Sequence, residues 1–106
     1  MDERAHLMIV RERARTLADE PGNEWFVGAV IVRAPDASPK KYVAVIPGAR
    51  SPVYFGARGY GDFVGHRDAR RRASYRKRAE GQRLRDGSRA IDAQGSPAWL
   101  SYNLLW

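Results

Sequence analysis

Apolar residues in the first twenty positions are compatible with two different elements. An amphipathic helix over residues 2–20 would place four of them on one face, which are Ala5, Met8, Ile9 and Leu17. The four consecutive apolar residues at 7–10 equally fit a short buried strand. Pro21 and Gly22 then end whichever element forms.

Three stretches rich in β-branched and aromatic residues follow, at 24–34, 41–46 and 53–55. Such composition is typical of strands, and the first stretch is apolar on both of its faces. Short turns rich in Pro, Gly, Asp and Ser separate the three stretches. Strands joined by tight connections favour an antiparallel β-meander, here within residues 24–55.

The pattern becomes helical over residues 67–82, where Asp68 stands near the start and suits the positive end of a helix dipole. The apolar stripe of this segment is thin, so we expect it to lie against the sheet with its basic side in water. A loop is predicted over 84–95. Ser96 as N-cap and Pro97 as first helical residue then begin a short aromatic helix.

These elements predict one small α+β domain over residues 1–106, a length that suits a single compact unit. An antiparallel meander of about three strands is followed by a basic helix and a short aromatic C-terminal helix. In this scheme residues 1–22 form an N-terminal arm or helix, and residues 66–106 form a helical region that is first basic and then aromatic.

Positive charge is concentrated in one part of the chain. The net charge is +7, and the stretch from His66 to Ala90 holds ten Lys or Arg against three acids, so it carries the whole excess. Nine of the ten bases are Arg, the better residue for bidentate contact with phosphate or carboxylate. The residues predicted to contact a polyanion or a partner are Arg67, Arg70, Arg71, Arg76, Lys77, Arg78 and Arg83. Nucleic acid, anionic lipid and an acidic protein face all fit, and a helix that only keeps the protein soluble is the alternative.

Residues of the types that carry chemistry are few in this chain. Asp62, His66 and Asp68 are close in sequence, but no further strong metal ligand accompanies them, and no nucleophile–base pair is evident. The glycine-rich stretch 56–61 lacks the Gly-Lys-Ser/Thr ending of a phosphate-binding loop, so its glycines are expected to permit tight turns. Cysteine is absent. We therefore expect no enzymatic activity, no cofactor, no metal and no small-molecule substrate.

The aromatic residues have two possible roles. Exposed rings beside a positive groove stack on bases in single-strand-binding proteins, and the candidates are Tyr54, Tyr60, Phe63, Tyr75, Trp99, Tyr102 and Trp106. A domain this small also needs aromatic rings for its core, so core or interface positions are expected for Trp25, Trp99, Tyr102 and Trp106. Trp99 and Trp106 are seven residues apart and would share a helix face. Trp106 is expected to occupy a pocket, either of this chain or of a partner.

A longer pattern runs from Tyr54 through Phe63 and continues with His66, Asp68, Arg71, Arg72, Tyr75 and Arg78, before a closing segment from Trp99 to Trp106. It resembles an uncharacterised family of small basic proteins encoded by nucleocytoplasmic large DNA viruses and by some algae and protists. The resemblance covers about residues 41–106. Residues 79–95 lack the basic-aromatic stretch that members often carry, and the first forty residues have no counterpart.

The resemblance implies a viral or virus-derived protein and a structural role for its motif residues, which are Gly56, Gly59, Asp62, His66, Asp68 and Tyr75. The two Asp would cap or pair with the Arg row, and the His would fix the turn. The first functional hypothesis is a minor capsid or cement protein in the virion, in contact with the major capsid protein or other minor capsid proteins. The alternative is a nucleic-acid-binding protein without sequence preference, in the host nucleus or cytoplasm, and an anionic membrane surface is a further possible partner.

Overall fold

A computed structural model describes all 106 residues of the chain and begins with the helix α1 (Glu3–Ala18). The predicted N-terminal helix is thus confirmed, and the alternative of a strand at 7–10 is wrong. The buried face of α1 passes through Val10, Ala14 and Leu17, whereas Met8, predicted on that face, is 64% exposed. α1 is the longest helix, and no helix has the length and apolar character needed to cross a membrane.

Three antiparallel strands form the sheet in the order β1–β2–β3, which confirms the predicted meander: β1 (Val30–Arg33), β2 (Lys40–Val45) and β3 (Val53–Ala57). The first strand is shorter than predicted. Residues Glu24–Phe26 form a 3-10 turn, η1, and Gly28 adopts a φ of 86°, which extended strand backbone does not allow. Phe26 is nevertheless buried, so apolar composition alone did not distinguish this turn from a strand.

The two faces of the sheet have different surroundings. Ile31 and Ala44 are paired across the strands on one face, and both belong to the main core with α1 and the C-terminal helix. The opposite face is lined by five apolar residues that pair across the strands, which are Val30, Val32, Val43, Val45 and Tyr54. All but Val43 are more than a third exposed, so this second face is largely uncovered.

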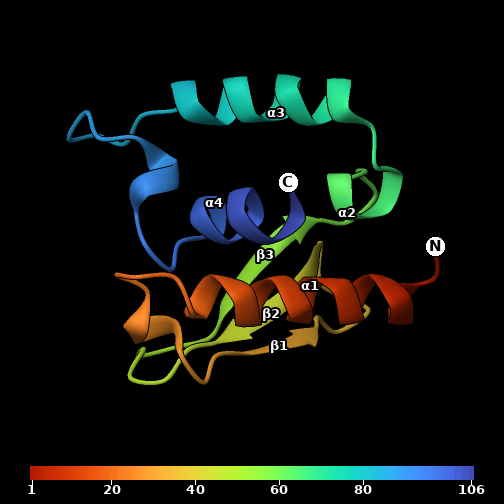
Figure 1. Cartoon of the computed structure of the whole chain (residues 1–106), viewed down its shortest axis with the longest axis horizontal. Helices are drawn as coiled ribbons and strands as arrows, with labels where there is room; N and C mark the ends of the chain where they lie inside the picture. Colours follow the sequence, from red (N-terminus) through yellow and green to blue (C-terminus); the bar gives the residue numbers. More distant parts are fainter.

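The predicted basic helix over residues 67–82 is observed as α3 (Ala69–Gly81), and a short helix that was not predicted, α2 (Phe63–His66), precedes it. Arg67 between them takes a left-handed φ of 57°, which ends α2. Asp68 then caps α3 by accepting hydrogen bonds from the backbone N–H groups of Arg70 and Arg71. The expectation that this helix lies against the sheet is wrong, because α3 lies on the far side of the C-terminal helix (Figure 1).

The C-terminal helix occupies the middle layer, between the sheet and α3 (Figure 1). A 3-10 turn, η2 (Ala90–Asp92), precedes this helix. The C-terminal helix itself consists of α4 (Pro97–Leu100) followed by a π-helical turn, η3 (Ser101–Leu105). The predicted start is confirmed, because the Ser96 side chain accepts the Trp99 N–H and Pro97 is the first helical residue. Leu100, Leu104 and Leu105 are almost completely buried. Because this apolar helix covers the sheet, α3 packs on the helix and not on the sheet.

Candidate functional site

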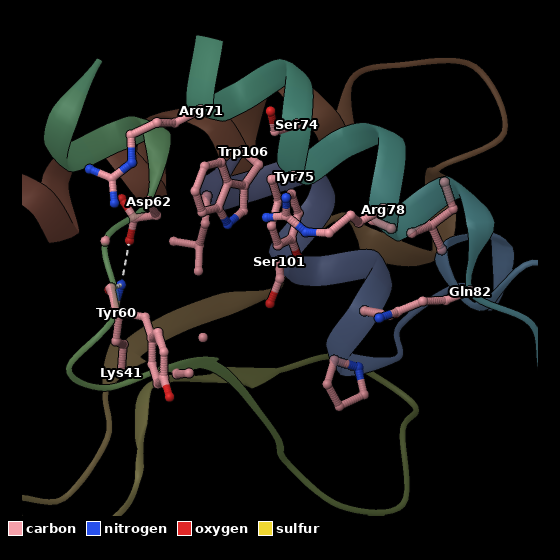
Figure 2. Close-up of a pocket in the computed structure, with 18 of the residues that line it drawn as sticks. Lys41, Tyr60, Asp62, Arg71, Ser74, Tyr75, Arg78, Gln82, Ser101 and Trp106 are labelled. Atoms are coloured by element: carbon pink, nitrogen blue, oxygen red, sulfur yellow. Dashed lines mark hydrogen bonds and ion pairs between the residues drawn. The ribbon is translucent and has the colours of Figure 1, made fainter. Parts of the chain in front are cut away.

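A groove of about 780 Å³ lies between α3 on one side and the β2–β3 edge with the Gly59–Gly61 loop on the other. The C-terminal helix closes its base. Five basic residues line it, which are Lys40, Lys41, Arg70, Arg71 and Arg78. Figure 2 shows Lys41 and Tyr60 on one wall and Arg71, Ser74 and Arg78 on the other. Asp62 is the only acidic residue that lines the groove, and it is buried.

The groove side of α3 carries three of the predicted contact residues, Arg70, Arg71 and Arg78. All three are exposed. None of them takes part in any ion pair of the structure. Their guanidinium charges are therefore not neutralised by the protein itself and face a partly enclosed space.

A different set of side chains fastens α3 to the C-terminal helix. Arg72 Nε donates to the backbone carbonyl of Trp106 at 2.6 Å, and the Arg76 guanidinium lies over the Tyr102 ring at 4.4 Å. The rings of Tyr75 and Trp106 are stacked, with centroids 4.2 Å apart and planes 7° apart. Burial raises the pKa of Tyr75. Arg76, predicted as a contact residue, is thus used in packing.

The other predicted contact residues lie outside the groove. Arg67 is 5.8 Å from the centroid of the Phe63 ring, and Arg83 donates to the backbone carbonyl of Glu80 at 2.7 Å. Lys77 is exposed on the outer side of α3. The basic segment is therefore not a uniform ridge. None of the basic side chains of α3 takes part in an ion pair, but only Arg70, Arg71 and Arg78 line the groove.

Few carboxylates offset the positive charge of the arginines on the inner side of α3. Burial, and next the charges of Arg72, Arg76 and Arg67, lower the pKa of Arg13 on α1. Only Asp62 acts in the opposite direction there. The positive charges of Arg67, Arg72 and Arg76, which do not line the groove, therefore also act on α1.

Asp62 holds one edge of the groove in place. Its carboxylate accepts from His6 Nε2 at 2.8 Å, from Lys41 Nζ at 2.7 Å and from the backbone N–H of Gly65 at 2.9 Å. Burial acts to raise the pKa of Asp62, but the hydrogen bonds from His6, Lys41 and Gly65 outweigh it and lower the pKa to about 2. One side chain thereby joins α1, β2 and the start of α2.

His6 continues this network to Tyr42. With Nε2 donating to Asp62, Nδ1 of a neutral ring accepts from the Tyr42 hydroxyl. Burial, followed by the charge of Asp62, raises the pKa of Tyr42 to about 12. Both ring nitrogens of His6 and both oxygens of Asp62 have hydrogen-bond partners within the protein, so the network clamps α1 to β2 and to the start of α2.

His66 and Asp68 do not converge on Asp62. Instead, His66 Nδ1 accepts the backbone N–H of Asp68 at 2.9 Å, at the turn between α2 and α3. Asp68 caps α3, whereas Asp62 caps α2 and pairs with Lys41 instead of with the Arg row.

Gly56 and Gly59 both adopt positive φ values, of 78° and 88°. A β-carbon on Gly56 would lie 2.8 Å from Leu105 Cδ1, whereas one on Gly59 would meet no atom within 4 Å. Gly56 thus allows β3 to approach the C-terminal helix, and Gly59 only shapes the turn that carries Tyr60.

The predicted aromatic residues separate into two groups. Trp25 and Trp99 pack together with Phe26 in the core, with Trp25 and Trp99 centroids 5.1 Å apart. Trp106 instead contacts Tyr75 and His66. The prediction that Trp99 and Trp106 share a face is wrong, because the π-helical turn η3 changes the helical repeat between them.

Sequence reasoning missed two parts of this site. Lys40 and Lys41 at the start of β2 complete the basic lining of the groove, and adjacent lysines opening a strand were the available signal. His6 was noted only as a second histidine, since nothing local connects it to Asp62, 56 positions away.

Comparison with known proteins adds a family context to this geometry. Residues 30–79 match a family of unknown function, DUF5754. The chain resembles DUF5754 over just under half of its length. The DUF5754 match contains β1 to α3, and so both long walls of the groove, but neither His6 nor the C-terminal helix.

The chain is also 41% identical over 59 residues to an uncharacterised protein of Acanthamoeba polyphaga mimivirus. The match covers 56% of this chain and 59% of the mimivirus protein. No solved structure matches. The chain is therefore similar to uncharacterised proteins that occur in large DNA viruses, as the resemblance predicted, whereas the detailed motif stays a prediction. The DUF5754 match begins at residue 30, earlier than the expected start near 41.

Proposed function

We propose that the protein binds nucleic acid in the groove between α3 and the β2–β3 edge, through phosphate contacts that do not depend on base sequence. The observation that carries this proposal is the group of three unpaired arginines, Arg70, Arg71 and Arg78, on one wall of that groove. Guanidinium groups bind phosphate oxygens in bidentate fashion, and their release of counterions from the nucleic acid supplies affinity without sequence preference. Binding alone is the function proposed, and no catalytic step is included.

The rest of the groove supports the same partner. Lys40 adds a further positive charge that no carboxylate pairs with, and Asp62 is shielded by Lys41 and His6. A polyanion entering the groove would meet no exposed carboxylate in its lining. The alternative of a helix that only confers solubility does not account for the gathering of these charges on the enclosed side of α3.

The test is DNA binding measured by fluorescence anisotropy at increasing salt concentration. We expect the affinity to fall steeply as the salt concentration rises. The Arg71→Gln/Arg78→Gln variant should bind more weakly, and its plot of log affinity against log salt concentration should have a slope smaller by about one to two. The control is Arg4→Gln/Arg50→Gln, which makes the same change in charge at exposed positions outside the groove. Absent binding at low salt, or equal loss in both variants, would refute the proposal.

A second candidate function, a minor capsid or cement protein, is favoured by the uncovered apolar face of the sheet. Val30, Val45 and Tyr54 on that face are 52%, 47% and 42% exposed. Contiguous apolar surface of this kind commonly marks a protein–protein contact. In this proposal the face packs against a capsid protein of a large DNA virus, and the viral relative supports that setting.

This second candidate predicts that the protein is present at fixed stoichiometry with the capsid protein in purified particles. Quantitative mass spectrometry of the particles would measure it. A Val30→Ser/Val45→Ser variant should be incorporated less, whereas Arg71→Gln/Arg78→Gln should be incorporated normally. Absence of the wild-type protein from particles would end the capsid proposal and would leave the groove proposal untouched.

A further inference from the structure

We infer that the groove takes unpaired, single-stranded nucleic acid, with one base stacked on the ring of Tyr60 and the backbone following Arg71 and Arg78. This inference rests on the proposed function and deepens it. It specifies which form of nucleic acid is bound and which residue contacts a base.

Tyr60 combines a fixed backbone with a free ring. Its side chain is 75% exposed, more than any other large hydrophobic side chain of the protein. Its backbone carbonyl accepts from Lys41 Nζ at 2.6 Å, and Lys41 is in turn held by Asp62. The ring lines the groove and has no packing role, so it is available as a rigid stacking surface.

The arginines proposed to contact phosphate lie on the wall of the groove opposite the Tyr60 ring. A guanidinium nitrogen of Arg71 is 3.8 Å from the position that a β-carbon on Gly61 would take, so Arg71 reaches the loop that carries Tyr60 (Figure 2). Arg78 is seven residues further along α3, which corresponds to about 10 Å along a helix axis. Two arginines at this spacing can contact different phosphates of the same strand. The polar side chain of Ser74 lies between the two arginines in sequence and also lines the groove.

A duplex fits this arrangement less well. Its bases are stacked inside and cannot reach Tyr60 unless they are unpaired. An α-helix can also bind a duplex by entering its major groove, but the exposed residues of α3 outside the groove lining include Ala69, Ala73 and only one base, Lys77. The charge therefore lies in a concavity, where a single strand can enter.

The experiment compares a short labelled oligothymidylate with a duplex of the same length, at one low salt concentration. We expect the single strand to bind at least tenfold more tightly, and Tyr60→Ala to weaken single-strand binding about tenfold. Tyr60→Phe should retain the wild-type affinity, because it keeps the ring. Tyr54→Ala is the matched control, since it removes an exposed tyrosine from the opposite face of the sheet. Duplex binding should not respond to either alanine substitution.

The outcomes separate this inference from the proposed function. If single strand and duplex bind equally and Tyr60→Ala has no effect, the single-strand assignment is overturned while the groove function stands. If neither nucleic acid binds, the proposed function itself fails. Thymidine monophosphate that competes as well as unlabelled oligothymidylate would overturn the inference in favour of a free-nucleotide site.

Discussion

Substitution of Asp62 by Asn should destabilise the protein markedly at neutral pH. Asn is similar in size and can still accept the Gly65 N–H, but it lacks the charge that pairs with Lys41 and accepts from His6. Removing one partner of a buried ion pair costs about 3–5 kcal/mol. The Lys41 side chain is 20% exposed and keeps its bond to the Tyr60 carbonyl, so we expect the lower value, about 3 kcal/mol.

The pH dependence of this loss follows from the pKa of Asp62, which folding lowers from 3.8 to about 2. A carboxyl group with a lowered pKa stabilises the folded state above its unfolded pKa, and this contribution is lost as pH falls through the folded pKa. Nearly two pKa units correspond to about 2.5 kcal/mol. The difference between wild type and Asp62→Asn should therefore shrink by about 2 kcal/mol between about pH 5 and about pH 2.

Urea unfolding followed by tryptophan fluorescence at several pH values would measure both effects. Asp36→Asn is the control, because that carboxylate also pairs with two basic side chains, Arg33 and Arg58, but is 84% exposed, and such pairs contribute about 1 kcal/mol or less. A loss in Asp62→Asn no larger than in the control, or a loss that does not change with pH, would show that Asp62 is not the clamp described here.

Four further substitutions test the packing of β3, of α3 and of Tyr42. In urea unfolding, Gly56→Ala should lower the free energy of unfolding by about 3 kcal/mol and Gly59→Ala by about 1 kcal/mol. Both positions have a positive φ that strains an alanine, but only at Gly56 would the new β-carbon also crowd Leu105. Equal losses would contradict the close approach of β3 to the C-terminal helix. Trp106→Ala should raise amide hydrogen exchange throughout α3 while the sheet stays protected, because it removes the ring that stacks on Tyr75 of that helix. Unchanged exchange would mean that other contacts hold α3. Tyr42 has a pKa raised to about 12, so it stabilises the fold below about pH 10 and loses this effect as pH rises through 12. Between about pH 10 and about pH 12, the free energy of unfolding should fall by about 2 kcal/mol less for Tyr42→Phe than for wild type. An equal fall in both proteins would contradict a buried Tyr42 hydroxyl.

Local rules were sufficient for several elements of the fold. The meander follows from strand composition and short turns, and the caps at Asp68 and Ser96 follow from their side-chain chemistry at helix starts. The first strand was predicted too long because Trp25 and Phe26 are as apolar in a 3-10 turn as they would be in a strand. Local composition does not reveal which of these two conformations buries the rings.

The site depended more on tertiary placement. The concentration of arginines was visible in the sequence, but which of them face the groove was decided by the position of the C-terminal helix. That helix lies between the sheet and α3 and engages Arg72 and Arg76, whereas Arg70, Arg71 and Arg78 line the groove. The clamp of His6 on Asp62 joins positions 56 residues apart, a distance over which one sequence gives no signal.

The most direct test of the central claim is a titration of the isotope-labelled protein with oligothymidylate, followed by amide chemical shifts in NMR. If the groove binds the strand, the largest shifts should fall at Lys40, Gly61, Arg71 and Arg78, while Lys77 on the outer side of α3 and Val45 on the uncovered sheet face should change little. Shifts centred on the uncovered sheet face, or no shifts at low salt, would contradict a nucleic-acid site in this groove.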